Sequence, residues 1–240
     1  ETDEELSNFY TYVYETIKLV KDINPKTKYV EFYNEYGNQD PKVATRMQKT
    51  GYEAAKAADP EIIVIGGATA RFPLEFIESL LKEGFGNYID AFSGHPYTSE
   101  VKPEDTTFKY GTAMEQILSA RELLDRYGHE DVDIILSELS YTAFAACETE
   151  VDQASYGLRQ YIMVSPMVEE YIWYNAINKK GTGTASEFEG NYGLLKSWAR
   201  ETGVHYQAKP VTLAFGAYND LLAQGEKLGR VETDDEDVYI

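Results

Sequence analysis

Short apolar segments alternate with helix-like segments along most of this chain, and this alternation restricts its fold more than any other feature. The apolar segments that we interpret as strands are 28–33, 62–66, 88–93, 132–137 and 169–174. The segments that we interpret as helices are 3–22, 41–58, 73–82, 112–127, 151–164 and 209–224. Apolar strands that alternate regularly with helices predict a parallel sheet covered by helices, because parallel neighbours need a crossover connection.

Polar and aromatic side chains stand at, or just after, the ends of these predicted strands. They are Asn34, Glu35, His95, Tyr97, Glu138 and Trp173. In an eight-stranded barrel, strand ends of this kind open into one shared mouth, whereas in an open doubly wound sheet they spread along an edge. No glycine-rich phosphate loop follows any predicted strand, which weakens the dinucleotide-binding alternative. We therefore predict an α/β fold of the (β/α)8 TIM-barrel type.

The charge balance restricts the partners of the chain. Its 22 basic and 41 acidic side chains give a net charge of −19, which repels nucleic-acid phosphates and anionic membrane surfaces. We expect neutral or cationic ligands, and neither a nucleic-acid nor a membrane partner. The three histidines show no metal-ligand spacing, there is one cysteine, and no dinucleotide or P-loop pattern occurs, so we predict no cofactor and no metal.

Two of the strand ends carry a glutamate. Glu35 and Glu138 are 103 positions apart (138 − 35) and follow the first and fourth predicted strands. On a barrel, strand ends three positions apart face each other across the mouth. Two facing carboxylates are the equipment of a glycosidase: at about 5–5.5 Å, one protonates the leaving oxygen while the other attacks the anomeric carbon. Some of the 20 tyrosines could line a groove for a sugar, although most must serve in packing.

Several segments, in this order, resemble the clan A retaining glycoside hydrolases, in particular family 39 and related β-glycosidases. They read KYVEFYNE, KAADPEIIVIGG, IDAFSGHPY, DIILSELSY, YIWYNA, and NYGLL before QAKPVTLAF. The resemblance implies a (β/α)8 barrel that hydrolyses a carbohydrate substrate without a cofactor. It also implies a secreted or cell-surface location, although this chain shows no signal peptide.

The resemblance implies a role for each of the strand-end residues. Glu35 would be the acid/base at the end of barrel strand four, and Glu138 the nucleophile at the end of strand seven. Beside Glu35, Asn34 would hydrogen-bond the sugar 2-hydroxyl. From strand six would come His95 and Tyr97, the tyrosine near enough to orient the nucleophile. Finally, Trp173 from strand eight would form the stacking floor under the attacked sugar.

The chain departs from the family pattern in two ways. Tyr36 stands where the clan usually has the proline of Asn-Glu-Pro, and only about five β/α units, barrel strands four to eight, are present. We predict a partial barrel over residues 1–226 and an acidic tail over 227–240, where an appended β-domain would start. Such a piece would expose two strand edges, so we expect further segments of a longer chain, or another chain, to complete the barrel.

Two other interpretations stay open at this point. The missing strands and the altered Asn-Glu-Tyr fit a non-catalytic carbohydrate-binding or scaffolding module with a degenerate or incomplete barrel. An open-sheet α/β protein with an unrelated ligand is the third alternative.

Overall fold

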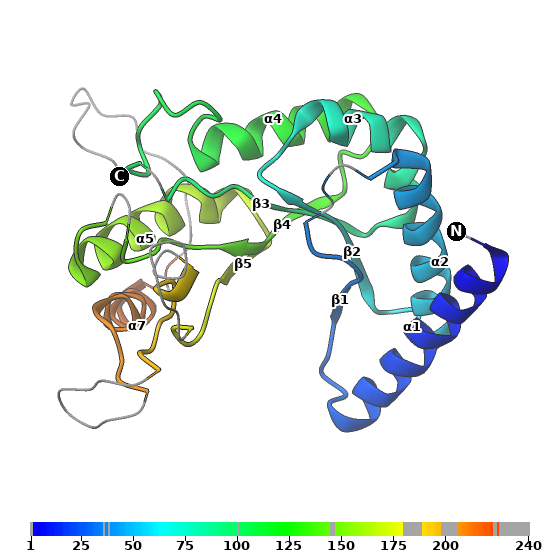
Figure 1. The fold of residues 1–240 in the computed structure, drawn as a ribbon, viewed down its shortest axis with the longest axis horizontal. Coiled ribbons are helices and arrows are strands. Elements are labelled where there is room, and N and C mark those ends of the chain that lie inside the picture. Colours follow the sequence, from blue (N-terminus) through cyan, green and yellow to red (C-terminus); the bar gives the residue numbers. More distant parts are fainter. Residues whose placement is uncertain are drawn as a thin grey trace. The chain divides into compact units, whose positions relative to one another are not determined.

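A computed structural model describes residues 2–35, 37, 39–99, 101–144, 147–179, 189–197, 206–222 and 225. The chain divides into two compact units, which we describe separately. Unit 1 comprises 1–96 and 116–137, and unit 2 comprises 97–115 and 138–240. Figure 1 traces the elements along the chain. Among the described residues, no helix has both the length and the apolar character that a membrane crossing requires.

Unit 1 is built from helices and parallel strands in alternation. Its elements are α1 (Asp3–Ile23), β1 (Tyr29–Glu31), α2 (Pro41–Ala58), β2 (Ile63–Ala70), α3 (Leu74–Lys82), a 3-10 turn (Phe85–Tyr88), β3 (Ala91–His95), and most of α4 (Ala113–Arg126) and β4 (Asp133–Leu139). The strands β1 to β4 pair in parallel, each with the next one along the chain. The boundary between the units falls within β4, after Ser137.

The strand order distinguishes between the two predicted kinds of sheet. With β5 (Glu170–Trp173) included, the order is β1-β2-β3-β4-β5, the same as the order in the sequence. A doubly wound sheet reverses its strand order at a switch point, whereas a barrel adds each strand beside the preceding one. The observed order is therefore that of a barrel segment.

The two faces of the unit 1 sheet bury different side chains. Alternate residues of a strand point to opposite faces, and here one set meets the helices α1 and α2, which lie side by side (Figure 1). The buried residues of that helix-facing cluster are Val13, Ile17, Ala54, Ala55, Ile62 and Val64. A separate cluster contains Ile65, Ala91 and Ile135, with Tyr29 and Ile63 packed against it. The pairing of β2 with β3 and of β3 with β4 brings the residues of the second cluster together. The same pairing sets the positions of the polar residues further along these strands.

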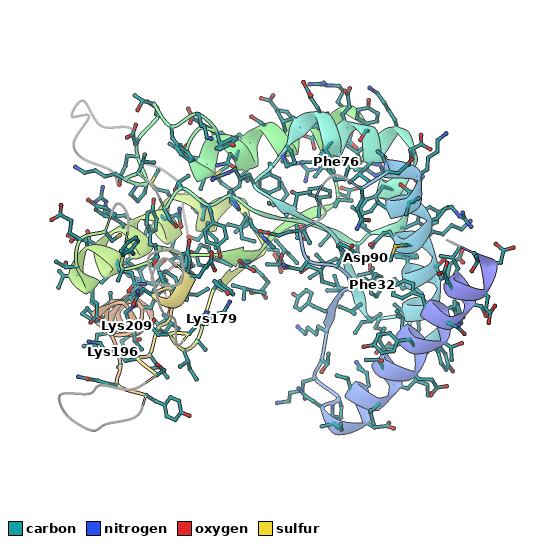
Figure 2. All side chains as sticks on the ribbon, viewed as in Figure 1. Phe32, Phe76, Asp90, Lys179, Lys196 and Lys209 are labelled. Atoms are coloured by element: carbon teal, nitrogen blue, oxygen red, sulfur yellow. The ribbon has the colours of Figure 1, made fainter. Side chains whose placement is uncertain are left out.

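The helix α2 shows how the sequence fixes an element and its packing. The Asp40 carboxylate accepts a hydrogen bond of 2.8 Å from the Lys42 backbone, and Pro41 occupies the first turn, as the sequence predicts. On its packed side, Phe32 lies against Gly51, where a Cβ atom would approach the ring to 2.5 Å. Further along α2, Lys56 forms an ion pair of 2.7 Å with Asp90. Phe32 and Asp90 are labelled in Figure 2.

The second strand corrects one prediction. The sequence predicts that Gly66-Gly67 ends the strand, but β2 continues to Ala70, with a shift in its pairing with β3 between Gly66 and Thr69. The irregularity has positive φ at Gly67 (111°) and Ala68 (42°), and the Ser93 hydroxyl accepts a 2.8 Å hydrogen bond from the Ala68 backbone. Because this bond satisfies the displaced N–H group, the strand continues beyond a bulge instead of ending.

Unit 2 contains the end of β4, α5 (Glu150–Val164), a 3-10 turn (Ser165–Met167), β5 (Glu170–Trp173) and α7 (Pro210–Leu222). A capping box between Thr149 and Asp152 starts α5. On the helical side, Tyr161 makes edge-on ring contacts of 5.2–5.4 Å between centroids with Tyr171, Phe215 and Tyr218. Much of the tyrosine content thus serves in packing. The predicted acidic tail, 227–240, lies outside the described residues.

One lysine is buried in unit 2 without a carboxylate in contact among the described residues. The Lys209 side chain, labelled in Figure 2, is fully buried. Its Nζ donates hydrogen bonds of 2.9 Å to the Asn191 carbonyl and 3.5 Å to Asn178 Oδ1. Burial lowers the pKa of Lys209 from its ordinary 10.5 to about 8. At neutral pH the folded chain therefore holds a charge in a poorly solvated place.

Lys209→Met should stabilise unit 2 at neutral pH and lose this advantage in alkali. Between pH 8 and 10.5 the unfolded chain keeps a proton that folded Lys209 has released, so native stability rises with pH across this window. Below pH 8 the charge costs about 3 kcal/mol, and the variant also forgoes about 1 kcal/mol of hydrogen bonding. We expect a gain of about 1–2 kcal/mol in urea unfolding at pH 7 that vanishes towards pH 10.5. A difference that stays constant with pH would contradict the assignment.

Candidate active site

In unit 1, the residues predicted at the ends of the first and third strands meet. Glu35 follows β1 in a left-handed conformation (φ 51°) and its side chain is 41% exposed, whereas His95, the last residue of β3, is 1% exposed. The two are joined by a hydrogen bond of 3.1 Å between His95 Nδ1 and Glu35 Oε1. On the other side of the ring, His95 Nε2 lies 3.1 Å from Ser137 Oγ. The neighbouring Asn34 is exposed.

The parallel register explains why these groups meet. Ser93 of β3 pairs with Ile135 of β4, and two residues further along the same register His95 lies beside Ser137, on the same face of the sheet. Along that face, β3 presents Ala91 to the apolar cluster, then Ser93, then His95. The environment thus changes from apolar to polar towards the carboxyl ends of the strands.

A second carboxylate, that of Glu31, is bound two residues before His95 along β3. The Ser93 hydroxyl donates a hydrogen bond to Glu31 Oε1 of β1, in the same way that His95 is hydrogen-bonded to Glu35. Its partner Ser93 lies on the same strand face as His95. Residue spacing within one strand does not reveal this contact between Glu31 and Ser93.

In unit 2, Tyr97 meets Glu138. The Tyr97 hydroxyl donates a hydrogen bond of 2.8 Å to Glu138 Oε1. Burial raises the pKa of Tyr97 strongly, and the nearby Glu138 charge raises it further. The phenol therefore keeps its proton at neutral pH and can only donate to an ionised Glu138, which fixes the carboxylate and leaves its second oxygen for other partners.

The indole of Trp173 is engaged in packing within unit 2. Its outer ring atoms lie 2.6–2.7 Å from the place where a Cβ atom on Gly157 would stand, and its centroid is 5.3 Å from that of Phe215. The indole N–H donates a 2.9 Å hydrogen bond to the Tyr192 carbonyl. These contacts with α5 and α7 fix the orientation of the indole, and its predicted role as the stacking floor stays a prediction.

The sequence did not single out Tyr174 and Tyr192, which are connected to Tyr97 through ring contacts. Tyr192 contacts Tyr97 and Tyr174 with centroid separations of 5.7 and 5.6 Å. Lys179 (Figure 2) donates a hydrogen bond to the Tyr174 hydroxyl. Tyr174 directly follows Trp173, the last residue of β5.

Neither unit by itself gathers three His, Cys, Asp or Glu ligand atoms among its described residues. The single cysteine, Cys147, is buried, and burial raises its pKa to about 12, so it remains a thiol at neutral pH. It therefore has neither the charge of a metal ligand nor that of a nucleophile. Tyr36, the replacement for proline after Glu35, lies outside the described residues.

Comparison with known proteins identifies the fold. No protein-family model and no curated protein matches the sequence. A family 39 glycoside hydrolase from the gut symbiont Bacteroides cellulosilyticus WH2 has a similar structure, with a TM-score of 0.76 at 21% identity over 97% of this chain and 47% of that chain. A family 39 enzyme from Xanthomonas axonopodis pv. citri has a TM-score of 0.65 at 17% identity, over 96% of this chain and 47% of that chain.

A family 39 β-xylosidase from Caulobacter crescentus has a TM-score of 0.65 at 16% identity, over 98% of this chain and 51% of that chain. The chain thus spans about half the length of these solved structures. At such identities the likeness shows the fold. It confirms the predicted α/β fold of the TIM-barrel type with about five β/α units, and the resemblance to family 39 glycoside hydrolases.

Proposed function

We propose that this chain carries the catalytic glutamates of a retaining β-glycosidase that hydrolyses oligo- or polysaccharides. The observation that carries the proposal is the hydrogen bond of a half-buried, protonated Tyr97 to Glu138 at the carboxyl end of β4, in a chain with the fold of glycoside hydrolases. Carboxyl ends of barrel strands are where TIM-barrel enzymes carry their catalytic residues.

In this proposal Glu138 is the nucleophile. Its ionised carboxylate attacks the anomeric carbon while Glu35 gives a proton to the leaving oxygen, and a covalent glycosyl-enzyme forms. In the second step Glu35 takes a proton from water, the water oxygen attacks the anomeric carbon, and the bond to Glu138 breaks. The hydrogen bond from Tyr97 orients the attacking carboxylate.

The remaining site residues would bind the sugar. The exposed amide of Asn34 would hydrogen-bond the 2-hydroxyl, and His95 would hold the acid/base. The indole of Trp173, held by its contacts with α5 and α7, would form the stacking floor under the attacked sugar.

The active form would include more chain than this one. The match covers 47–51% of the family 39 structures, and completing the barrel would place a further strand beside β1, an end strand of the sheet in the described residues. We therefore propose that further segments of a longer polypeptide, or another chain, complete the barrel. A secreted or cell-surface location is part of the same proposal.

The half-length coverage also favours a second candidate, a non-catalytic carbohydrate-binding or scaffolding module. The two candidates are separated by assaying aryl β-glycosides beside a binding assay on the same sugars, with this chain and with any longer polypeptide that contains it. The glycosidase should release the aryl group, and proton NMR should show the β-anomer of the sugar first. Binding without turnover would favour the module, and the α-anomer first would exclude double displacement.

A further inference from the structure

His95 connects two groups of unit 1 that the proposed mechanism does not otherwise link. Its buried ring lies between Glu35 Oε1 and Ser137 Oγ, at 3.1 Å from each. No other hydrogen-bond partner of the Ser137 hydroxyl, nor any partner of Glu35 Oε2, occurs among the residues that the structure describes. Glu35 itself stands on the segment after β1, and its side chain is 41% exposed. Its orientation therefore depends on His95.

The direction of these hydrogen bonds follows from the chemistry of the three groups. An ionised carboxylate can only accept, so His95 Nδ1 must carry the hydrogen that it shares with Glu35. A neutral imidazole has one N–H group, which leaves Nε2 with a lone pair. The Ser137 hydroxyl can donate to that lone pair, and the chain of bonds then runs from Ser137 through His95 to Glu35.

The same direction serves a protonated Glu35. If the acid proton resides on Oε2, then Oε1 still accepts from His95 Nδ1–H, and neither partner has to change. We call the chain of hydrogen bonds from Ser137 through His95 to Glu35 the tether. It occupies one carboxyl oxygen of Glu35 and leaves the other for a glycosidic oxygen. The opposite arrangement, with the acid proton on Oε1 and donated to Nδ1, would withhold that proton from substrate.

We propose that Ser137 is a positioning residue, which acts through His95 to hold Glu35 with Oε1 engaged and Oε2 free for the substrate. The strand register supports the assignment, since the β3–β4 pairing that joins Ser93 to Ile135 also brings His95 beside Ser137. The catalytic consequence rests on the proposed glycosidase function. The hydrogen bonding of His95 does not rest on that function and can be measured separately.

The first test is nitrogen NMR of the histidine rings, which needs no activity. The chain has three histidines, so labelling them with 15N gives few signals, and His95→Gln identifies those of His95. Above the pH at which the ring protonates, we expect Nδ1 to carry the hydrogen and Nε2 to show the shift of a lone pair that accepts a hydrogen bond. In Ser137→Ala the Nε2 signal should move to the position of an unbonded lone pair, and Ser137→Thr should restore it. An Nε2–H tautomer in the parent chain would overturn the proposal.

The second test compares substrates in the active protein. Poor leaving groups need the proton of Glu35, whereas activated aryl groups do not. Ser137→Ala should therefore lower kcat/KM about 10-fold or more for unactivated glycosides and less than 3-fold for dinitrophenyl glycosides, with Ser137→Thr close to the parent. Ser79→Ala, which removes a hydroxyl bonded within α3, is the control. Equal losses on both substrates would reduce Ser137 to a structural role.

The two tests separate two kinds of failure. If the NMR result is as expected and no glycoside is cleaved by any form of the protein, the proposed function fails while the tether stands. If glycosides are cleaved but Ser137→Ala leaves both the Nε2 signal and the leaving-group dependence unchanged, the proposed function stands and the tether fails.

Discussion

Replacing Glu138 with alanine is expected to lower the rate of glycoside hydrolysis on the order of 10⁴-fold or more, because the substitution removes the group that forms the covalent intermediate. The loss should appear with every leaving group, since the attack on the anomeric carbon precedes any role of water. Initial rates on aryl β-glycosides measure it. Full activity in Glu138→Ala on all hydrolysed substrates would show that the nucleophile is another residue.

A second variant separates chemistry from folding. In Glu138→Ala the hydroxyl of the half-buried Tyr97 loses this acceptor, at a cost of about 1–3 kcal/mol, so lower stability could be mistaken for lost catalysis. Glu138→Gln keeps an acceptor oxygen at the same place and should be equally inactive with nearly unchanged stability.

Added azide gives an independent sign of the role. In Glu138→Ala, azide can occupy the place of the missing carboxylate. It then attacks the sugar from the side that Glu138 would attack and should yield the α-glycosyl azide. In Glu35→Ala, azide instead attacks the intermediate formed on Glu138 and should yield the β-glycosyl azide. The reverse pairing of variants and products would exchange the two assignments.

Much of the element order could be predicted because each element carries local signals. The helix that starts after Asp40 at Pro41 and ends at Ala58 was predicted with the bounds that the structure shows. The extension of β2 past Gly66-Gly67 could not be predicted in this way. It depends on Ser93, 25 residues after Ala68, whose hydroxyl satisfies the N–H group displaced at the bulge.

The site shows the same division between local and distant information. The strand ends with polar residues were visible in the sequence, and they lie at the carboxyl ends of the strands or just after them. Which side chains touch depends on register between strands, so the contacts of His95 with Ser137 and of Ser93 with Glu31 were not foreseen.

The bulge in β2 also gives the largest stability effect that we expect. Gly67 has φ 111°, and a Cβ atom there would stand 2.5 Å from the Ser93 carbonyl oxygen. That oxygen belongs to the backbone of β3, so it cannot rotate away as a side chain would. Moving it would disturb the Ser93 hydroxyl that bonds Ala68 and Glu31.

Gly67→Ala should therefore destabilise unit 1 by about 3 kcal/mol or more, the sum of backbone strain and overpacking. Gly128→Ala is the matched control: Gly128 also has positive φ (80°), but nothing lies within 4 Å of the added Cβ atom. It should cost only about 1 kcal/mol, from conformation alone. Urea unfolding followed by the signals of unit 1 measures both. Equal losses would mean that the close approach of β2 to Ser93 relaxes at little cost, and the bulge would then not hold His95 and Glu31 in register.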